Sequence, residues 1–285
     1  MTVDTTVEIA TSREDAEAVD AVRAHHAELS GALTLRTTTL TSAAAAVADS
    51  AGRAERARHD LVEWCRAELV PHALAEETAM YPAAQSLPEG RLLVSGMLAD
   101  HAVLTGLVGD LADAVDPVVA AGAARALHVL FESHLAKEND LLLPLLLASP
   151  AVSVADLLQG MHTVLGGHEA FEAAPGRAPE VAPADVTREE DAAHGRHRCT
   201  CGGSEEAGHP ELDARSIPHA IRHATIFGAL DAVSPGAGLV LVAPHDPLPL
   251  LAQAADRYDG AFTVDYLERG PEAWRLLLTR VAPGT

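Results

Sequence analysis

One pattern of histidine, glutamate and proline occurs twice in the sequence, and it limits what the chain can fold into. The segments HALAEETAMYP (72–82) and HLAKENDLLLP (134–144) each place a glutamate four residues after a histidine and a proline ten residues after it. Four residues make a little more than one helical turn, so each histidine shares a helix face with its glutamate. Apolar residues such as Met80 and Leu141 lie near the two pairs. We therefore expect both pairs to border an apolar stripe and to point inward.

Two other stretches have an apolar repeat at helical spacing, and each holds one histidine in phase with that repeat. The first begins with a capping sequence at Ser12 and holds His26 in phase, with the adjacent His25 as the alternative. The second holds His101 in phase. Each of four helices therefore offers one inward histidine, and two of the helices add a carboxylate.

The same periodicity sets the expected lengths of the helices. After the first helix, we expect helices at roughly 53–80, 91–115 and 118–143, and a shorter one at 154–171. Long amphipathic helices joined by short turns are typical of an antiparallel four-helix bundle. The sequence therefore predicts a bundle with the histidines and glutamates at its centre.

The C-terminal part of the chain has a different character. Residues 173–210 are rich in Pro, Ala, Gly and Glu and have no apolar period, which predicts a linker. Residues 211–285 then alternate strand and helix patterns in the order β-α-β-α-β-β, which indicates a small two-layer α/β domain. The predicted fold class is α + α/β, with a helical bundle at 1–172, the linker at 173–210 and the second domain at 211–285.

Burial of these histidines and glutamates has two interpretations. A lone inward histidine is usually an ordinary core residue, and an isolated HxxxE pair stabilises a helix by only about 0.2–0.5 kcal/mol. Two carboxylates and four imidazoles together are different, because burying unpaired charge costs several kcal/mol per group. A pair of bound cations offsets that cost, with the glutamates bridging the metals. The predicted ligands are His26, His72, Glu76, His101, His134 and Glu138.

The chemistry of these side chains narrows the choice of metal. Imidazole and carboxylate without thiolate suit iron or manganese, and open coordination positions suit a redox-active non-haem iron. Tyr81 and Glu77 are candidates for hydrogen bonds to the ligands, and the alternative for Glu77 is a solvated position on the helix surface.

Charge and composition exclude several classes of function. The net charge is −21, from 20 basic and 41 acidic residues, and such a field repels nucleic acid and anionic membrane surfaces. Three cysteines cannot build a disulfide framework, so we expect a reducing, cytoplasmic location. The longest apolar run, LLLPLLLASPAV, is short and interrupted by Pro144, so we expect no membrane-spanning helix.

The linker and the second domain hold further candidate groups. Cys199 and Cys201 in CTCGG could form a small thiolate–imidazole site with neighbouring histidines, act as a redox pair, or remain unliganded. His219, His223 and His245 could bind a metal or cofactor where a loop meets a helix. The alternative is that Asp246 and His245 only cap the helix and form hydrogen bonds in the loop.

The order of the motifs identifies a family for residues 12–171. A histidine on the first helix, HxxxE on the second, histidine on the third and HxxxE on the fourth resemble the hemerythrin-like, or HHE cation-binding, family. The resemblance implies an up-down bundle with a non-haem di-iron centre held by the six residues given above. Two iron ions are the expected cofactor, with manganese or zinc as less favoured alternatives.

Two departures from the oxygen-carrying hemerythrins change what the resemblance implies. Thr105 stands where those proteins have a second histidine on the third helix, and the fourth-helix motif ends with Glu138 rather than an aspartate. The set is closer to the iron-centre repair proteins of the same superfamily, which respond to nitric oxide and oxidants. One missing ligand leaves a position that could admit oxygen, peroxide or nitric oxide.

A second resemblance covers nearly all of the C-terminal segment. The runs LDARSIPHAIRHATIFGALD, LVLVAPHDPLPLL and YLERGPEAWRLLLTR are similar to the domain of unknown function 2249. That family is similar in fold to the TusA/SirA sulfur-relay proteins, which carry sulfur on a Cys-Pro at the start of the first helix. Here the matching stretch, 216–219, has no cysteine, so we expect no sulfur relay through it.

These observations favour one function and leave others open. The leading hypothesis is a di-iron protein that senses or handles oxygen, peroxide or nitric oxide in an iron or redox stress response. The alternatives are an iron donor for iron–sulfur cluster repair and a di-iron peroxidase or nitric oxide-reducing enzyme. In a further, non-enzymatic alternative, the C-terminal domain binds a protein partner and the bundle is only a scaffold.

Overall fold

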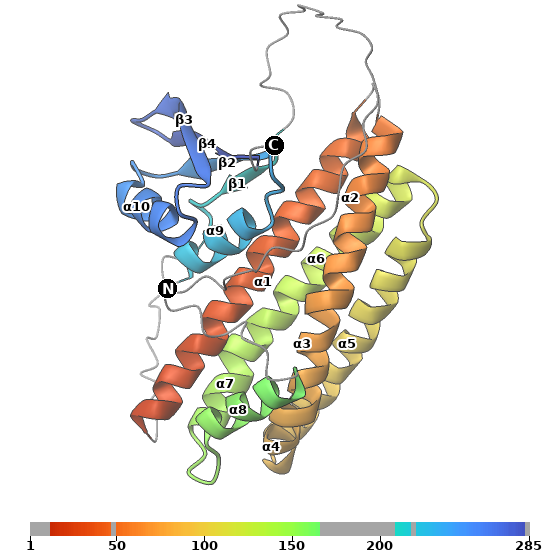
Figure 1. Ribbon diagram of the computed structural model, residues 1–285. Coiled ribbons are helices and arrows are strands. Elements are labelled where there is room, and N and C mark those ends of the chain that lie inside the picture. The colour runs from red at the N-terminus through yellow and green to blue at the C-terminus, as the bar shows by residue number, and fades with distance from the viewer. Residues whose placement is uncertain (1–11, 47–49, 166–208, 218–220, 283–285) are drawn as a thin grey trace, which may run out of the picture.

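The structure is a computed structural model that describes residues 12–46, 50–165, 209–217 and 221–282 (Figure 1). It has a long, mostly helical N-terminal region and a small mixed sheet with two helices at the C-terminus. Residues 166–171, which the periodicity adds to the fifth helix, lie outside the described residues, as does nearly all of the predicted linker.

The helical region is built from long rods that lie side by side (Figure 1). The first and third rods are single helices, α1 (Arg13–Ala45) and α5 (Gly90–Asp113). The second rod joins α2 (Ser50–Trp64), η1 (Cys65–Leu69), α3 (Val70–Ala75), η2 (Glu76–Met80) and α4 (Tyr81–Ser86). The fourth rod joins α6 (Pro117–Lys137), η3 (Glu138–Leu142) and α7 (Leu143–Leu147), and α8 (Val154–Val164) follows it. This arrangement is compatible with the expected four-helix bundle.

The predicted capping sequence does begin α1. The Ser12 hydroxyl accepts a hydrogen bond from the Asp15 backbone N–H at 3.0 Å, which satisfies one of the free donors at the helix start. The Asp15 carboxylate in turn accepts bonds from the Ser153 hydroxyl and the Ala155 N–H at the start of α8. One buried aspartate thus ties the ends of two helices together.

The second and fourth rods continue beyond the positions at which the periodicity ends them. The expected ends were at residues 80 and 143, but the helices run on through Pro82 to Ser86 and through Pro144 to Leu147. The reason lies in the π-helical turns η2 and η3, which directly precede these segments. A proline lacks an N–H and clashes with the carbonyl four residues earlier. Widening the turn before the proline relieves this conflict, so the rod continues.

Two apolar clusters fill the interior of the helical region. One surrounds Leu33, Leu61 and Phe131, and the other surrounds Met80 and Met97. Along each rod the predicted inward histidine lies between residues of the first cluster and residues of the second. The polar groups therefore form a layer enclosed by apolar packing on both sides.

Helix α5 is long and apolar enough, by length and composition, to cross a membrane, although the apolar runs suggested no such segment. Its most apolar window has a mean hydropathy of 1.5, and only 28% of that window is buried. Leu92 and Val103 are exposed on its outer surface, whereas His101 on its inner side is buried. A single helix of this kind is weak evidence for a membrane span, and α5 here packs along α6 and supplies a polar group to the interior.

The C-terminal domain has the predicted order of elements. These are β1 (Glu211–Asp213), α9 (Arg222–Asp231), β2 (Gly238–Ala243), α10 (Leu248–Arg257), β3 (Phe262–Arg269) and β4 (Trp274–Arg280). The strand order in the sheet is β1-β2-β4-β3, with β1 and β2 parallel and the other pairs antiparallel. Leu241 of β2 lies between Leu212 and Leu276 of its neighbours and packs in the same core as Ile226 and Leu250 of the two helices.

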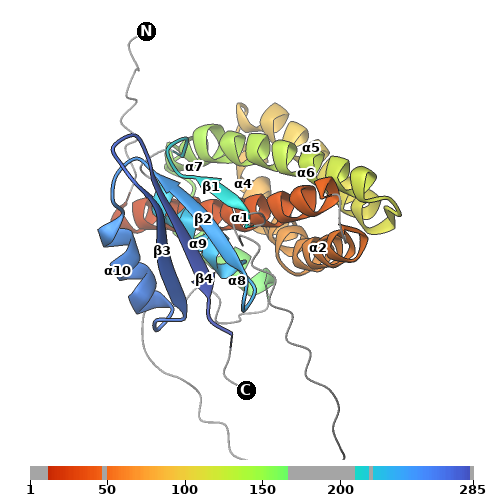
Figure 2. The ribbon, with the colours of Figure 1, turned by 90° about the horizontal axis from the view of Figure 1, so that it is seen from above.

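The C-terminal domain is seated against α1, with α9 lying along that helix (Figure 2). The backbones approach so closely at two glycines that a Cβ on Gly31 would strike the Thr225 carbonyl, and a Cβ on Gly228 would strike the Glu28 carbonyl. Leu35 of α1 is buried in the core of the C-terminal domain. Helix α1 therefore serves both domains, through opposite sides.

Candidate metal centre

The carboxylate of Glu76 lies at the centre of the polar layer. Its Oε1 is 3.0 Å from His72 Nε2 and 3.3 Å from His26 Nε2. Its Oε2 is 3.5 Å from His101 Nε2. One carboxylate thus faces two imidazoles with one oxygen and a third imidazole with the other.

Glu138 spans the same space from the fourth rod. Its Oε2 is 3.6 Å from His26 Nε2, and its Oε1 is 3.6 Å from His134 Nε2. His134 Nε2 also lies 2.9 Å from His101 Nε2. Each glutamate therefore reaches from the His26 side of the layer to the side that holds His101 and His134.

The six predicted residues form two overlapping groups that could each hold a metal ion. The first contains His26, His72, Glu76 and Glu138, and the second contains Glu76, His101 and His134. Within each group the ligand atoms lie within 4.8 Å of one another. All six side chains are buried, with exposures of 0–5%. The structure thus brings together all six residues that the sequence proposed as ligands in the helical region.

Hydrogen bonds on the outer side of three imidazoles fix their orientation. Nδ1 of His101 is 2.8 Å from Glu77 Oε1, and Nδ1 of His26 is 2.9 Å from Asn139 Oδ1. Nδ1 of His134 is 3.3 Å from Asp100 Oδ2. Because each of these oxygens accepts a hydrogen bond from Nδ1–H, the lone pair that binds a metal is on Nε2.

The outer acceptors include two residues that sequence reasoning did not single out. Asp100 and Asn139 directly neighbour the predicted ligands His101 and Glu138 in the chain, and that adjacency was the one available signal. Asp100 is also bound by Lys137. Glu77 combines the two alternatives considered for it, since it bonds His101 while its side chain stays 35% exposed.

Tyr81 places a hydroxyl group among the candidate ligands. The hydroxyl donates to Glu138 Oε1 at 2.7 Å and lies 3.2 Å from His101 Nε2. Burial, together with the nearby charges of Glu76 and Glu138, raises the pKa of Tyr81. The phenol therefore keeps its proton and presents it to the centre of the site.

Burial and neighbouring charges inside the layer shift the pKa values of Glu76, His26 and His101. Burial alone would raise the pKa of Glu76, but the adjacent imidazoles of His72, His101 and His26 hold that pKa well below the usual value. Burial alone would lower the pKa of His26 and His101, but bonds to Glu76 and the charge of Glu138 raise both. Without a metal, the layer therefore stabilises the ionised carboxylate of Glu76 and the protonated imidazoles of His26 and His101.

Some buried polar atoms have no hydrogen-bond partner among the described residues. Among the six candidate ligands, these atoms are both ring nitrogens of His72 and Oε2 of Glu138. His72 Nε2 is close to Glu76 Oε1, but the geometry is not that of a hydrogen bond. Unpaired buried polar groups are costly, and a cation in the first ligand group would satisfy His72 Nε2 and Glu138 Oε2 together. The donor set therefore fits a metal.

The remaining histidines and cysteines that the sequence suggested as ligands lie outside the two ligand groups or outside the described residues. His25 packs its ring 5.0 Å from that of His72, and burial together with His72 lowers the pKa of His25 to about 3. Cys199, Cys201 and His219 lie outside the described residues. His223 and His245 lie in the C-terminal domain, where both line one pocket.

Comparisons with known proteins agree with both resemblances. Residues 17–146 match the model of the hemerythrin HHE cation binding domain. Residues 211–280 match that of an uncharacterized conserved protein family, DUF2249. No curated protein and no solved structure matches the chain.

Proposed function

Because the chain carries a hemerythrin HHE cation binding domain followed by a DUF2249 domain, we propose that it is a non-haem di-iron protein that senses or handles oxygen, peroxide or nitric oxide. One observation carries the proposal: the two ligand groups share Glu76, and each glutamate reaches both sides of the polar layer. A shared carboxylate between two sets of imidazoles suits a pair of ions better than one.

Donor chemistry and charge support iron. Each side of the layer offers two imidazoles and carboxylate oxygens, with no thiolate, and this combination suits iron and leaves room for an exogenous ligand. When bound, two iron ions would supply a change of oxidation state and a place for a small ligand to coordinate. Two carboxylates supply two negative charges, so a divalent pair keeps a net positive charge that attracts anionic or polarised ligands.

The residues around the centre suit it to a small, sheltered ligand. The apolar clusters on both sides of the layer exclude bulk water and strengthen electrostatic interactions inside it. The Tyr81 hydroxyl donates its single proton to Glu138 and could turn that proton to a ligand bound beside this carboxylate. Glu77, Asp100 and Asn139 keep the imidazoles in one orientation. The hydrogen bonds to Glu77 and Asp100 also make Nε2 of His101 and Nε2 of His134 stronger ligands for a metal.

Burial weighs against the alternatives. A protein that delivers iron to damaged clusters must release it readily, whereas these side chains are at most 5% exposed. An adaptor with a purely structural bundle has no need for six buried polar groups, whose burial is costly without a cation.

The test is metal analysis of the full chain, with absorption spectra before and after exposure to air and to nitric oxide. We expect about two irons per chain and absorption bands that change on exposure. The double variant Glu76→Ala, Glu138→Ala should lose the iron. Glu132→Ala is the matched control, because Glu132 lies on the same rod as Glu138 but is 44% exposed and outside both groups. Full iron content in a folded double variant, checked by circular dichroism, would falsify the ligand assignment.

A further inference from the structure

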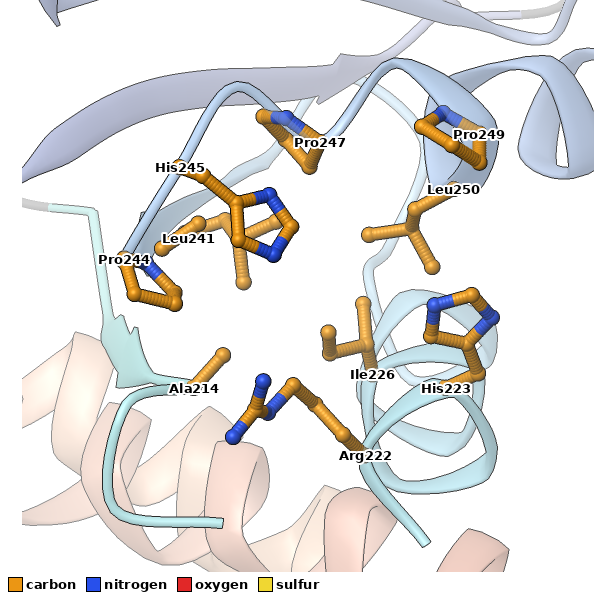
Figure 3. Close-up of a pocket in the computed structure, with 11 residues that line it drawn as sticks. Ala214, Arg222, His223, Ile226, Leu241, Pro244, His245, Pro247, Pro249 and Leu250 are labelled. Carbon is orange, nitrogen blue, oxygen red and sulfur yellow. The ribbon is translucent and has the colours of Figure 1, made fainter. Parts of the chain in front are cut away.

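The C-terminal domain has a pocket where its two parallel strands end (Figure 3). Ala214 follows β1, Pro244 and His245 follow β2, and Arg222 begins α9 on the other side of the pocket. The volume is about 70 Å³. In sheets covered by helices, ligands bind outside the carboxyl ends of parallel strands, because the loops diverge there. The location is therefore one where a ligand is expected.

The polar side chains of the pocket are one guanidinium, of Arg222, and two imidazoles, of His223 and His245. The guanidinium of Arg222 donates from Nε and Nη2 to the Ile217 carbonyl, at 3.1 and 2.8 Å. These bonds hold the side chain in place, and its Nη1 makes no hydrogen bond with any described residue. Figure 3 shows the guanidinium and the His245 ring turned toward the same open space, with the His223 ring at the far side.

Both imidazoles are held from outside the pocket. Nδ1 of His223 lies 3.2 Å from Gln253 Oε1, and Nδ1 of His245 lies 3.3 Å from the Asp246 carbonyl oxygen. Because both acceptors are carbonyl oxygens, Nδ1 donates in each case. The Nε2 atoms are then the ones left to meet a ligand.

Acidic side chains are absent from the lining among the residues that the structure describes. The nearest in sequence are Asp213, whose carboxylate pairs with Arg215 at 2.7 Å, and Asp246, whose carboxylate accepts a bond from the Tyr266 hydroxyl at 2.8 Å. This absence is notable because the whole chain carries a net charge of −21. A guanidinium with a free N–H and no carboxylate beside it is suited to an anion.

The remaining lining is apolar. The side chains of Ile226, Leu241 and Leu250 project into the pocket between the polar groups (Figure 3). An inorganic anion such as phosphate would leave this surface without a partner. An anion with a short hydrocarbon tail would cover it and gain the hydrophobic contribution.

We propose that this pocket binds a small monocarboxylate, with the carboxylate on Arg222 and the alkyl tail on Ile226, Leu241 and Leu250. Size supports this class, because a water-sized site takes roughly 10–15 Å³ by the same kind of measure, so the pocket holds about five to seven non-hydrogen atoms. Propionate and butyrate have that size. The site is separate from the metal centre, so the proposal does not depend on iron binding.

The test is a protein-detected NMR titration of the full chain with propionate, with phosphate and propionamide as comparison ligands. We expect saturable shifts of the amides around Ala243 and Arg222, and binding of phosphate and of uncharged propionamide at least about tenfold weaker. Arg222→Gln should weaken propionate binding by at least about tenfold. Arg275→Gln is the matched control, since Arg275 pairs with Glu211 outside the pocket and should leave binding unchanged.

Other outcomes overturn the proposal. If propionate gives no saturable shifts, the pocket does not bind it. If propionate binds Arg222→Gln as well as the natural chain, the carboxylate does not sit on Arg222. Equal binding of phosphate and propionate would mean that the apolar lining plays no part. Arg222→Lys keeps the charge and guards against misfolding, so it should retain part of the affinity that Arg222→Gln loses.

Discussion

The close approach of the two domains at Gly31 leads to a prediction with two opposite effects. A Cβ at Gly31 would lie 2.9 Å from the Thr225 carbonyl carbon and 2.9 Å from the Ala229 nitrogen of α9. These are backbone atoms, which cannot swing aside as a flexible side chain can. In Gly31→Ala the two helices must therefore move apart.

The size of each effect follows from the surroundings. Forcing an extra methyl into a packed contact typically costs about 1–3 kcal/mol, which would weaken docking of the C-terminal domain by roughly 5- to 150-fold. Within α1 itself, alanine in place of glycine stabilises the helix by about 1 kcal/mol. Undocking and a slightly more stable helical region should thus appear in the same variant.

Gly106→Ala is the matched control, because a Cβ at Gly106 of α5 has no neighbour within 4 Å. Gly106→Ala should stabilise its own helix without weakening the docking of the C-terminal domain. Small-angle scattering reports the separation of the domains, and hydrogen exchange of the α9 amides reports loss of the contact. Iron content should stay unchanged in both variants, since Gly31 lies outside the ligand groups. If Gly31→Ala behaves like Gly106→Ala in every measurement, the α1–α9 contact is not formed in solution.

Four further predictions concern the polar layer. Because the pKa values of His26 and His101 are raised in the folded, metal-free protein, protonation of these imidazoles stabilises the fold. This stability is fully present below about pH 6.5 and is lost as the pH rises through the pKa values of the folded state. Urea unfolding at several pH values would measure the loss. Metal binding must displace those protons, so Fe²⁺ affinity should fall as pH drops through the same range, by up to about tenfold per pH unit for each proton, and an affinity independent of pH would contradict this. Tyr81→Phe removes the donor to Glu138, so it should destabilise the metal-free protein by about 1–3 kcal/mol without changing iron stoichiometry, as unfolding and metal analysis would show. Asp100→Ala leaves Nδ1 of His134 without its acceptor and should lower iron affinity by roughly 10- to 100-fold in a competition assay, and unchanged affinity would mean that the bond does not orient the ring.

Residue spacing was sufficient to predict the members of the candidate centre and the order of the C-terminal elements. His72 with Glu76 and His134 with Glu138 are four residues apart, and a helix necessarily puts such residues on one face. The strand around Leu241 could be predicted for a similar reason, because a short apolar run bounded by Gly238 and Pro244 is a local signal. These inferences need only the geometry of one segment at a time.

The π-helical turns show where a regular period fails. With a strict helical period, Leu145 lies two turns after Glu138 on the inner face, but it is only partly buried, and Leu146 is fully buried instead. Leu141, expected beside the same stripe, is 53% exposed. The wide turn η3, which begins at Glu138, adds a residue and shifts the phase of all that follows. Pro144 indicated where the helix is irregular, but the sequence alone did not show that the irregularity is a π-helical turn, because that depends on how the turn packs.

What the sequence determined by itself is the local part: which segments are helix or strand, and which histidines and glutamates share a helix face. Only the tertiary structure decided that Asp100 and Asn139 reach the imidazoles, that Glu76 and Glu138 each span both sides of the polar layer, and that α9 rests on α1. The physical reason is that these contacts join residues far apart in the chain. They depend on how close two backbones can come, and no single segment specifies that distance.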